Sequence, residues 1–133
     1  MRVVRRPLVL VVDDDASCNA LMVELLERSG YRVVSAANGG EALAILDEGL
    51  RPAVIVADLM MPVMHGWDLI ASLRSRPALA SVPVLVTSAV HDPNRANLYD
   101  AVFLPKPLRL ETLLAAVEAA CTGESSRRAA ARG

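Results

Sequence analysis

The chain has 133 residues, of which 53% are hydrophobic and 22% are charged, and its formal net charge is -1. This length and composition fit one compact domain, so we expect a single hydrophobic core. The near-neutral charge and the 3% aromatic content offer no electrostatic or stacking basis for nucleic-acid binding, so we expect proteins or small ligands as partners.

The apolar stretches are short throughout the chain. The first one, residues 8–12, ends at Asp13 and is too short for the core of a signal peptide. No stretch approaches the roughly 18 apolar residues that a membrane span needs. We therefore expect a cytoplasmic protein without membrane contact.

Five short apolar runs alternate along the chain with longer segments of helical period. The runs are residues 8–12, 32–36, 53–57, 82–86 and 102–104. This alternation is typical of βα units around a parallel sheet. Because several runs are apolar at successive positions, helices should cover both faces of that sheet. The pattern predicts an α/β fold with five strands.

The segments between the runs carry apolar residues three and four positions apart, which predicts helices. These helices contain residues 21–26, 42–46, 69–73 and 110–117, and glycines follow the first two at Gly30 and Gly49. A further short helix should open at Asp92-Pro93, where aspartate can cap and proline can occupy the first helical position. No large apolar residue follows Thr122. We therefore expect a domain over residues 1–122 and a disordered tail over 123–133.

Polar residues occur where the predicted strands end. Asp13 and Asp14 follow the first run, Asp58 follows the third, Thr87 follows the fourth and Lys106 comes shortly after the last. In an open α/β sheet, ligands bind outside the carboxyl ends of the strands. We therefore expect these five side chains to form one site.

The residue types indicate what such a site would bind. Three carboxylates repel one another unless a cation lies among them, and Mg²⁺ is the hard ion that prefers such oxygen ligands. A hydroxyl and an ammonium group, from Thr87 and Lys106, suit phosphate oxygens. Asp58 stands alone at its strand end and is the best candidate for a nucleophile that forms an aspartyl phosphate. Each residue alone has an ordinary structural explanation, and only their joint placement supports the hypothesis.

Four motifs resemble the receiver domain of two-component response regulators. They are VVDDD at residues 11–15, VADLMMPVMHG at 56–66, VLVTSA at 84–89 and LPKP at 104–107. The resemblance extends from about Leu8 to about Cys121. It implies a doubly wound, flavodoxin-like receiver fold with five parallel strands in the order 2-1-3-4-5. It also implies a phosphoprotein that acts as a stand-alone response regulator in signal transduction or a phosphorelay.

The resemblance assigns a role to each site residue. Asp58 would accept a phosphoryl group from a sensor histidine kinase or a phosphotransfer protein. Asp14 would bind Mg²⁺ directly and Asp13 mainly through water, with the main-chain carbonyl of Met60 as a further ligand. Such a protein catalyses only its own phosphorylation and dephosphorylation and is not otherwise an enzyme.

The remaining roles concern the response to the phosphoryl group. Thr87 would move its hydroxyl onto that group, and Lys106, which precedes a cis bond to Pro107 in the family, would pair with another of its oxygens. Phe103 occupies the place of an aromatic that turns inward in this switch. Its alternative role is packing of a strand aromatic against a helix, and the sequence leaves both open.

Two features depart from the family pattern. His65 stands where the family usually has aspartate, and the segment between Thr87 and Lys106 is short. That segment usually forms the signalling surface in the family, so we expect an unusual downstream partner. The phosphorylated state would be recognised by another protein or by self-association as a homodimer.

Two alternative functions deserve comparison with the phosphorylation switch. One is a receiver-like interaction module that is never phosphorylated, against which the complete set of site residues argues. The other is a small haloacid-dehalogenase-like phosphohydrolase in which Asp13 is the nucleophile and Asp15 completes the Asp-x-Asp motif. The chain lacks the cap segment and the later acidic pair expected of such an enzyme.

Overall fold

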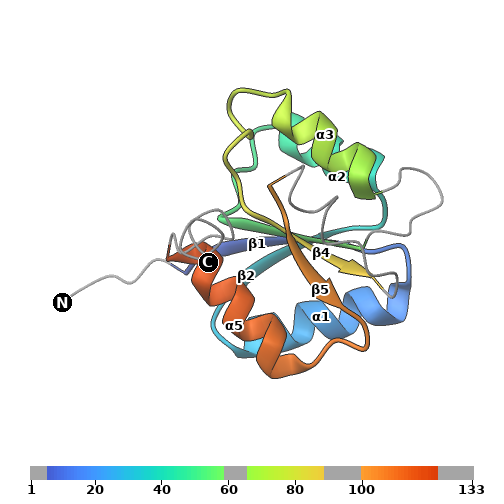
Figure 1. Cartoon of the computed structure of the whole chain (residues 1–133), viewed down its shortest axis with the longest axis vertical. Coiled ribbons are helices and arrows are strands. Elements are labelled where there is room, and N and C mark those ends of the chain that lie inside the picture. The colour runs from blue at the N-terminus through green and yellow to red at the C-terminus, as the bar shows by residue number, and fades with distance from the viewer. Residues whose placement is uncertain (1–5, 59–65, 89–99, 123–133) are drawn as a thin grey trace.

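The computed structural model describes residues 6–58, 66–88 and 100–122. These residues form a parallel five-stranded sheet with helices on both faces (Figure 1). The strands are β1 (Leu8–Val12), β2 (Arg32–Ala36), β3 (Val54–Asp58), β4 (Val84–Ser88) and β5 (Val102–Pro105). The helices are α1 (Ala16–Arg28), α2 (Gly39–Asp47), α3 (Gly66–Arg74) and α5 (Leu110–Cys121). The helix expected at Asp92-Pro93 and the tail expected after Thr122 lie outside the described residues.

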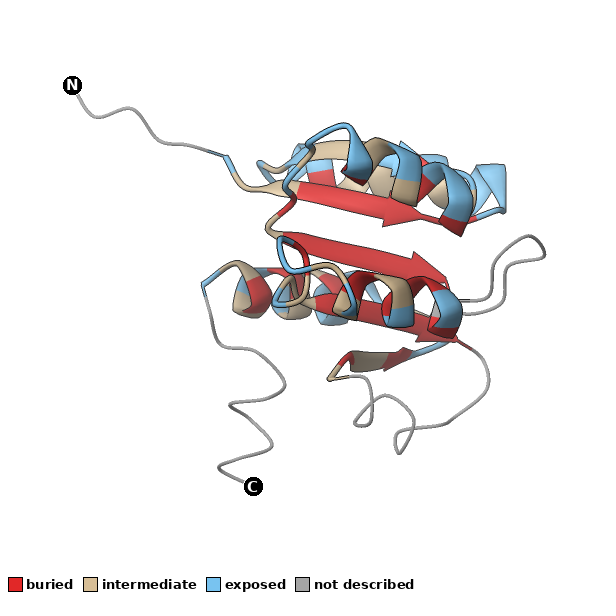
Figure 2. Ribbon diagram, turned by 90° about the horizontal axis from the view of Figure 1, so that it is seen from above, coloured by how far each residue is buried: buried red, intermediate tan, exposed pale blue. Residues whose placement is uncertain are grey.

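The strand order is β2-β1-β3-β4-β5, which confirms the doubly wound, flavodoxin-like topology. In Figure 1, α2 and α3 cover one face of the sheet, and α1 and α5 cover the other. The alternation along β1 explains this arrangement. Leu10 and Val12 belong to the core on the α2 and α3 side, whereas Val9 and Val11 belong to the core on the α1 and α5 side. Figure 2 looks down onto the sheet and shows that its central strands are buried.

The third and fourth strands extend further than their apolar runs. We predicted that they end at Ala57 and Val86, but β3 includes Asp58 and β4 continues to Ser88. These polar residues belong to the sheet because Asp58 and Thr87 are paired in register. The fourth strand also begins later than predicted, at Val84. Its predecessor Pro83 has no N–H for a sheet ladder and only accepts a bond from the Ile55 N–H, at 3.0 Å.

Local sequence signals explain where the first two helices begin and end. Asp15 caps α1, since its side chain accepts hydrogen bonds from the N–H groups of Ser17 and Cys18. Gly30 and Gly49 follow α1 and α2 with φ of 100° and 112°. Nothing lies within 4 Å of a Cβ placed at either glycine, so backbone conformation and not space favours glycine there. Among the described helices, none has the length and apolarity that a bilayer crossing would require.

Candidate functional site

The buried polar side chains gather at one edge of the sheet. Within the described residues they belong to Asp13, Asp58, Thr87 and Ser88, which are 2%, 7%, 0% and 1% exposed. Asp13 directly follows β1, and the other three end β3 and β4. Charged and polar side chains are rarely buried in this way without partners or a function. This edge is therefore the candidate site, at the position that the sequence predicted.

Three carboxylates meet at the centre of this edge, and we call Asp13, Asp14 and Asp58 the acidic pocket. Each can place one oxygen within 4.8 Å of the others. They meet because β1 and β3 are neighbours, with Val12 and Ala57 paired in register immediately before the acids. Oxygen ligands at this spacing suit a hard divalent cation such as Mg²⁺.

The environment of Asp13 raises the pKa of its carboxyl group. Burial raises the pKa of Asp13 above its ordinary value, and the Asp58 carboxylate raises it further. The N–H of Asp15 donates to Asp13 Oδ1 at 2.9 Å and opposes these effects. The Lys106 ammonium also lowers the Asp13 pKa, but the raising effects prevail, so ionised Asp13 is less favourable here than in solvent.

Lys106 supplies a positive charge beside Asp58. Its Nζ lies 3.4 Å from Asp58 Oδ1, and its side chain is 37% exposed against 8% for Asp58. The N–H of Lys106 donates to the carbonyl of Ser88 at 2.9 Å, which ties the lysine to the end of β4. The Lys106–Pro107 bond is cis, as the resemblance implied.

Thr87 contributes a buried hydroxyl to this edge. It is fully buried, and its Oγ1 has no hydrogen-bond partner among the described residues. An unpaired buried hydroxyl costs free energy in the folded state. Because Thr87 is the register partner of Asp58, a phosphate on Asp58 would bring an acceptor close to this hydroxyl.

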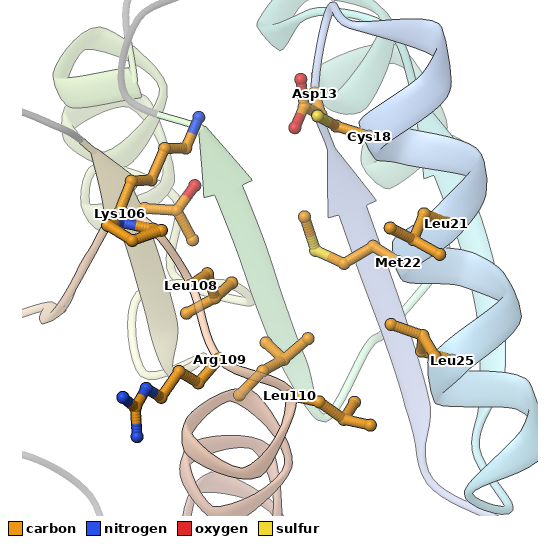
Figure 3. A pocket seen from close by; sticks show the side chains of 12 residues that line it. Asp13, Cys18, Leu21, Met22, Leu25, Lys106, Leu108, Arg109 and Leu110 are labelled. Atoms are coloured by element: carbon orange, nitrogen blue, oxygen red, sulfur yellow. The ribbon is translucent and has the colours of Figure 1, made fainter.

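A groove of about 250 Å³ leads from these residues between α1 and α5. Thr87 is among the residues that line it. Asp13 and Lys106 lie at its polar end (Figure 3). The rest of what we call the α1–α5 groove is mostly apolar and is lined by Cys18, Leu21, Met22, Leu25, Pro107, Leu108, Arg109, Leu110 and Leu113. Leu21 and Leu110 are 57% and 40% exposed. Sequence reasoning missed this surface because it assigned both leucines to the apolar faces of their helices.

The other residues singled out in the sequence differ in their placement. Phe103 is half-buried and packs against the core on the α2 and α3 side, which agrees with the packing role. Met60 and His65 lie outside the described residues.

Comparison with known proteins identifies the family. The response regulator receiver domain matches residues 9–118. The chain is 36% identical over 105 residues to the two-component response regulator ORR7 of Oryza sativa subsp. japonica, covering 76% of this chain and 50% of that protein. It is 38% identical over 125 residues to the transcriptional regulatory protein PrrA of Mycobacterium tuberculosis, covering 87% of this chain and 50% of that protein.

The chain therefore spans about half the length of these curated relatives. Among solved structures, the chemotaxis protein CheY4 of Vibrio cholerae superposes with a TM-score of 0.80 at 32% identity. That match covers 86% of this chain and 98% of CheY4. Sequence and fold agree that this chain belongs to the response regulator receiver domain family.

Proposed function

We propose that Asp58 accepts a phosphoryl group from a phosphohistidine in a Mg²⁺-dependent reaction, and that this modification changes which proteins the receiver binds. The observation that carries the proposal is the position of Asp58 within the acidic pocket, 3.4 Å from the ammonium of Lys106 and in register with Thr87. Phosphoryl transfer requires mainly positioning and charge neutralisation, and this arrangement supplies both.

In this mechanism a carboxylate oxygen of Asp58 attacks phosphorus. The new P–O bond forms as the P–N bond to the donor imidazole breaks, and the imidazole nitrogen keeps the electron pair. Asp13, Asp14 and Asp58 would hold Mg²⁺, with the carbonyl of Met60 as the further ligand that the resemblance implies. The bound cation would neutralise charge on the transferring phosphoryl group.

Lys106 and Thr87 would stabilise the charge on the phosphoryl oxygens. The Lys106 ammonium already lies beside Asp58 and would pair with one oxygen as the transfer proceeds. The Thr87 hydroxyl would donate to another, which would give this buried group a partner. On β5, Phe103 pairs in register with Val86, next to Thr87. A displacement of Thr87 would therefore reach Phe103, which is the switch role we propose for it.

The donor would be a sensor histidine kinase or a phosphotransfer protein, and the α1–α5 groove would receive it. The groove is continuous with the site, since Asp13 and Lys106 line it together with the exposed leucines Leu21 and Leu110 (Figure 3). A donor helix with apolar residues around its phosphohistidine would bury this surface while presenting phosphorus to Asp58. The downstream partner would be another protein or a second copy of the chain.

The decisive experiment incubates the protein with Mg²⁺ and acetyl phosphate and measures its intact mass. We expect one added phosphoryl group on the wild type, none on Asp58→Asn and none when EDTA removes the metal. Asp13→Asn serves as the second variant. Equal labelling of wild type and Asp58→Asn would exclude Asp58 as the acceptor, and loss of labelling only in Asp13→Asn would favour the phosphohydrolase.

The structure gives one argument against that phosphohydrolase. Its Asp-x-Asp motif requires Asp15 to act in the site, yet the Asp15 side chain accepts the N–H groups of Ser17 and Cys18 at 2.9 and 3.1 Å. Asp15 is therefore engaged as the cap of α1. A wild type that is not labelled by any phosphodonor would instead support the phosphorylation-independent interaction module.

A further inference from the structure

The side-chain amide of Asn19 bridges the ends of two strands. Its Nδ2 donates to the carbonyl of Asp13 at 3.0 Å and to the carbonyl of Ala36 at 3.1 Å. An amide nitrogen carries two hydrogens, so this arrangement uses the full donor capacity of the side chain. Asn19 is half-buried in the first turns of α1. It thereby joins the residue after β1 to the last residue of β2.

These bonds close a ring around Asp13. The N–H of Asp13 donates to the Ala36 carbonyl at 3.1 Å, and that same carbonyl accepts from Asn19. Asn19 then returns a hydrogen bond to the Asp13 carbonyl. The Oδ1 atom of Asp13 is held separately by the N–H of Asp15. The main chain of Asp13 is thus fixed on both sides and its carboxylate is fixed at one oxygen.

The Asp13 carbonyl belongs to the planar peptide group that connects Asp13 to Asp14. A hydrogen bond to this carbonyl fixes the orientation of that plane, and with it the relative directions of the two side chains. Both carboxylates belong to the acidic pocket. Asn19 thus influences the geometry of two pocket residues although it contributes no carboxylate.

We infer that Asn19 is a positioning residue that sets the magnesium affinity of the acidic pocket, an inference that rests on the proposed function. Mg²⁺ demands near-ideal octahedral geometry, so a rotated Asp13–Asp14 peptide weakens binding even when all carboxylates remain. Outer partners of metal ligands typically contribute 10- to 100-fold in affinity. Because Asn19 acts through the main chain, we expect a smaller effect of about 3- to 10-fold.

The effect of Asn19→Ala on metal affinity can be distinguished from an effect on folding stability. Asparagine is a poorer helix former than alanine, so Asn19→Ala gains helix propensity while it loses two hydrogen bonds. The two effects on folding stability oppose each other. A change in metal affinity can therefore be measured on a folded variant.

The experiment titrates MgCl₂ into the metal-free protein by isothermal titration calorimetry, comparing wild type, Asn19→Ala and Asn38→Ala. Asn38 is the matched control because its Oδ1 accepts from the Glu41 N–H at 2.8 Å. Asn38→Ala also removes a hydrogen bond between a side chain and the main chain near the end of β2, but that bond does not involve Asp13. We expect Kd for Mg²⁺ to rise about 3- to 10-fold in Asn19→Ala and to stay within about 2-fold of wild type in Asn38→Ala.

A second readout follows phosphorylation by acetyl phosphate as a function of Mg²⁺ concentration. The half-saturating Mg²⁺ concentration should rise in Asn19→Ala, and the rate at saturating Mg²⁺ should match wild type. Equal Mg²⁺ affinity in wild type and Asn19→Ala would overturn the inference, as would a similar loss in Asn38→Ala. If Asn19→Ala does not fold, Asn19→Gln carries the same prediction, because its longer side chain displaces the two donors. A wild type without Mg²⁺ affinity would refute the proposed function itself.

Discussion

Asp58 and Thr87 face each other in register across β3 and β4, and both side chains are buried. Since the Thr87 hydroxyl has no partner among the described residues, Thr87→Val should leave the unmodified protein as stable as wild type or more stable by up to about 1 kcal/mol. The gain in Tm on phosphorylation should shrink in Thr87→Val, because valine cannot donate to the phosphate. Thr87→Ser retains the hydroxyl and should keep most of that gain. Thermal unfolding with and without acetyl phosphate would measure both effects, and a full gain in the valine variant would contradict the role of Thr87.

Lys106→Met should slow phosphorylation strongly with little effect on stability. Its ammonium lies 3.4 Å from Asp58, and removal of one such stabilising group commonly costs about 100-fold or more in rate. The ion pair is partly exposed, so unfolding free energy should change by no more than about 1 kcal/mol. Arg109→Met removes an exposed cation that lines the same groove and serves as the control. Equal rates of mass labelling in the two variants would exclude a specific role for Lys106.

Neutralising the buried acid should stabilise the metal-free protein. The pKa of Asp13 is raised in the fold by burial and by Asp58, so its ionised form is less favourable there than in the unfolded chain. The resulting loss of folding stability is absent when the pH is below the pKa of Asp13 in the unfolded chain. It is complete when the pH is above the raised pKa of Asp13 in the folded protein. At neutral pH in EDTA, Asp13→Asn should therefore raise Tm by about 2–5 °C, whereas at acidic pH this advantage should disappear.

Asp14→Asn is the control for that experiment, because Asp14 is exposed and its charge is well solvated. Its effect on Tm in EDTA should be smaller. Saturating Mg²⁺ should reverse the order, since wild type gains stability by binding the cation and both variants gain less. A wild type that is more stable than Asp13→Asn in EDTA at neutral pH would show that repulsion within the acidic pocket is not significant.

The α1–α5 groove should matter only when the phosphodonor is a protein. Leu21→Ser combined with Leu110→Ser should reduce the efficiency of transfer from a histidine-phosphorylated phosphotransfer protein by about tenfold or more, because buried apolar anchors dominate such contacts. Labelling by acetyl phosphate should not change. Ala20→Ser alters an exposed position of α1 that does not line the groove and should affect neither reaction. If the double variant lost the same phosphorylation rate with both donors, the leucines would affect the phosphorylation site itself and not the docking of the protein donor.

The sequence predicted the strands well where residues on both faces are buried. Along β1 and β3, successive residues alternate between the two helical layers. Both layers are apolar, so the continuous apolar run itself marks the strand. The predicted ends of β3 and β4 were wrong because both strands end in polar residues. Asp58 and Ser88 are polar, and an apolar pattern ends before them although the hydrogen-bonded ladder does not.

The site was predicted from the residues that follow the strands, but the strand order came from the resemblance. Periodicity alone cannot place β1 between β2 and β3, which is the arrangement that brings Asp13 close to Asp58. Nor does the sequence distinguish Asn19 from any polar helical residue, because its role depends on carbonyls of Asp13 and Ala36 that only the fold brings together. The exposure of Leu21 was missed because helical spacing shows which residues share a face of the helix but not whether another element covers that face.

The parallel topology also governs when this site can exist during protein synthesis. Its side chains enter the ribosomal exit tunnel in the order Asp13, Asp58, Thr87 and Lys106, and each arrives with a different strand or the turn that follows it. A nascent polypeptide that has released only β1 to β3 carries the three carboxylates but lacks both the hydroxyl and the ammonium. The complete set of side chains that we propose for phosphoryl transfer therefore exists only after β5 has docked.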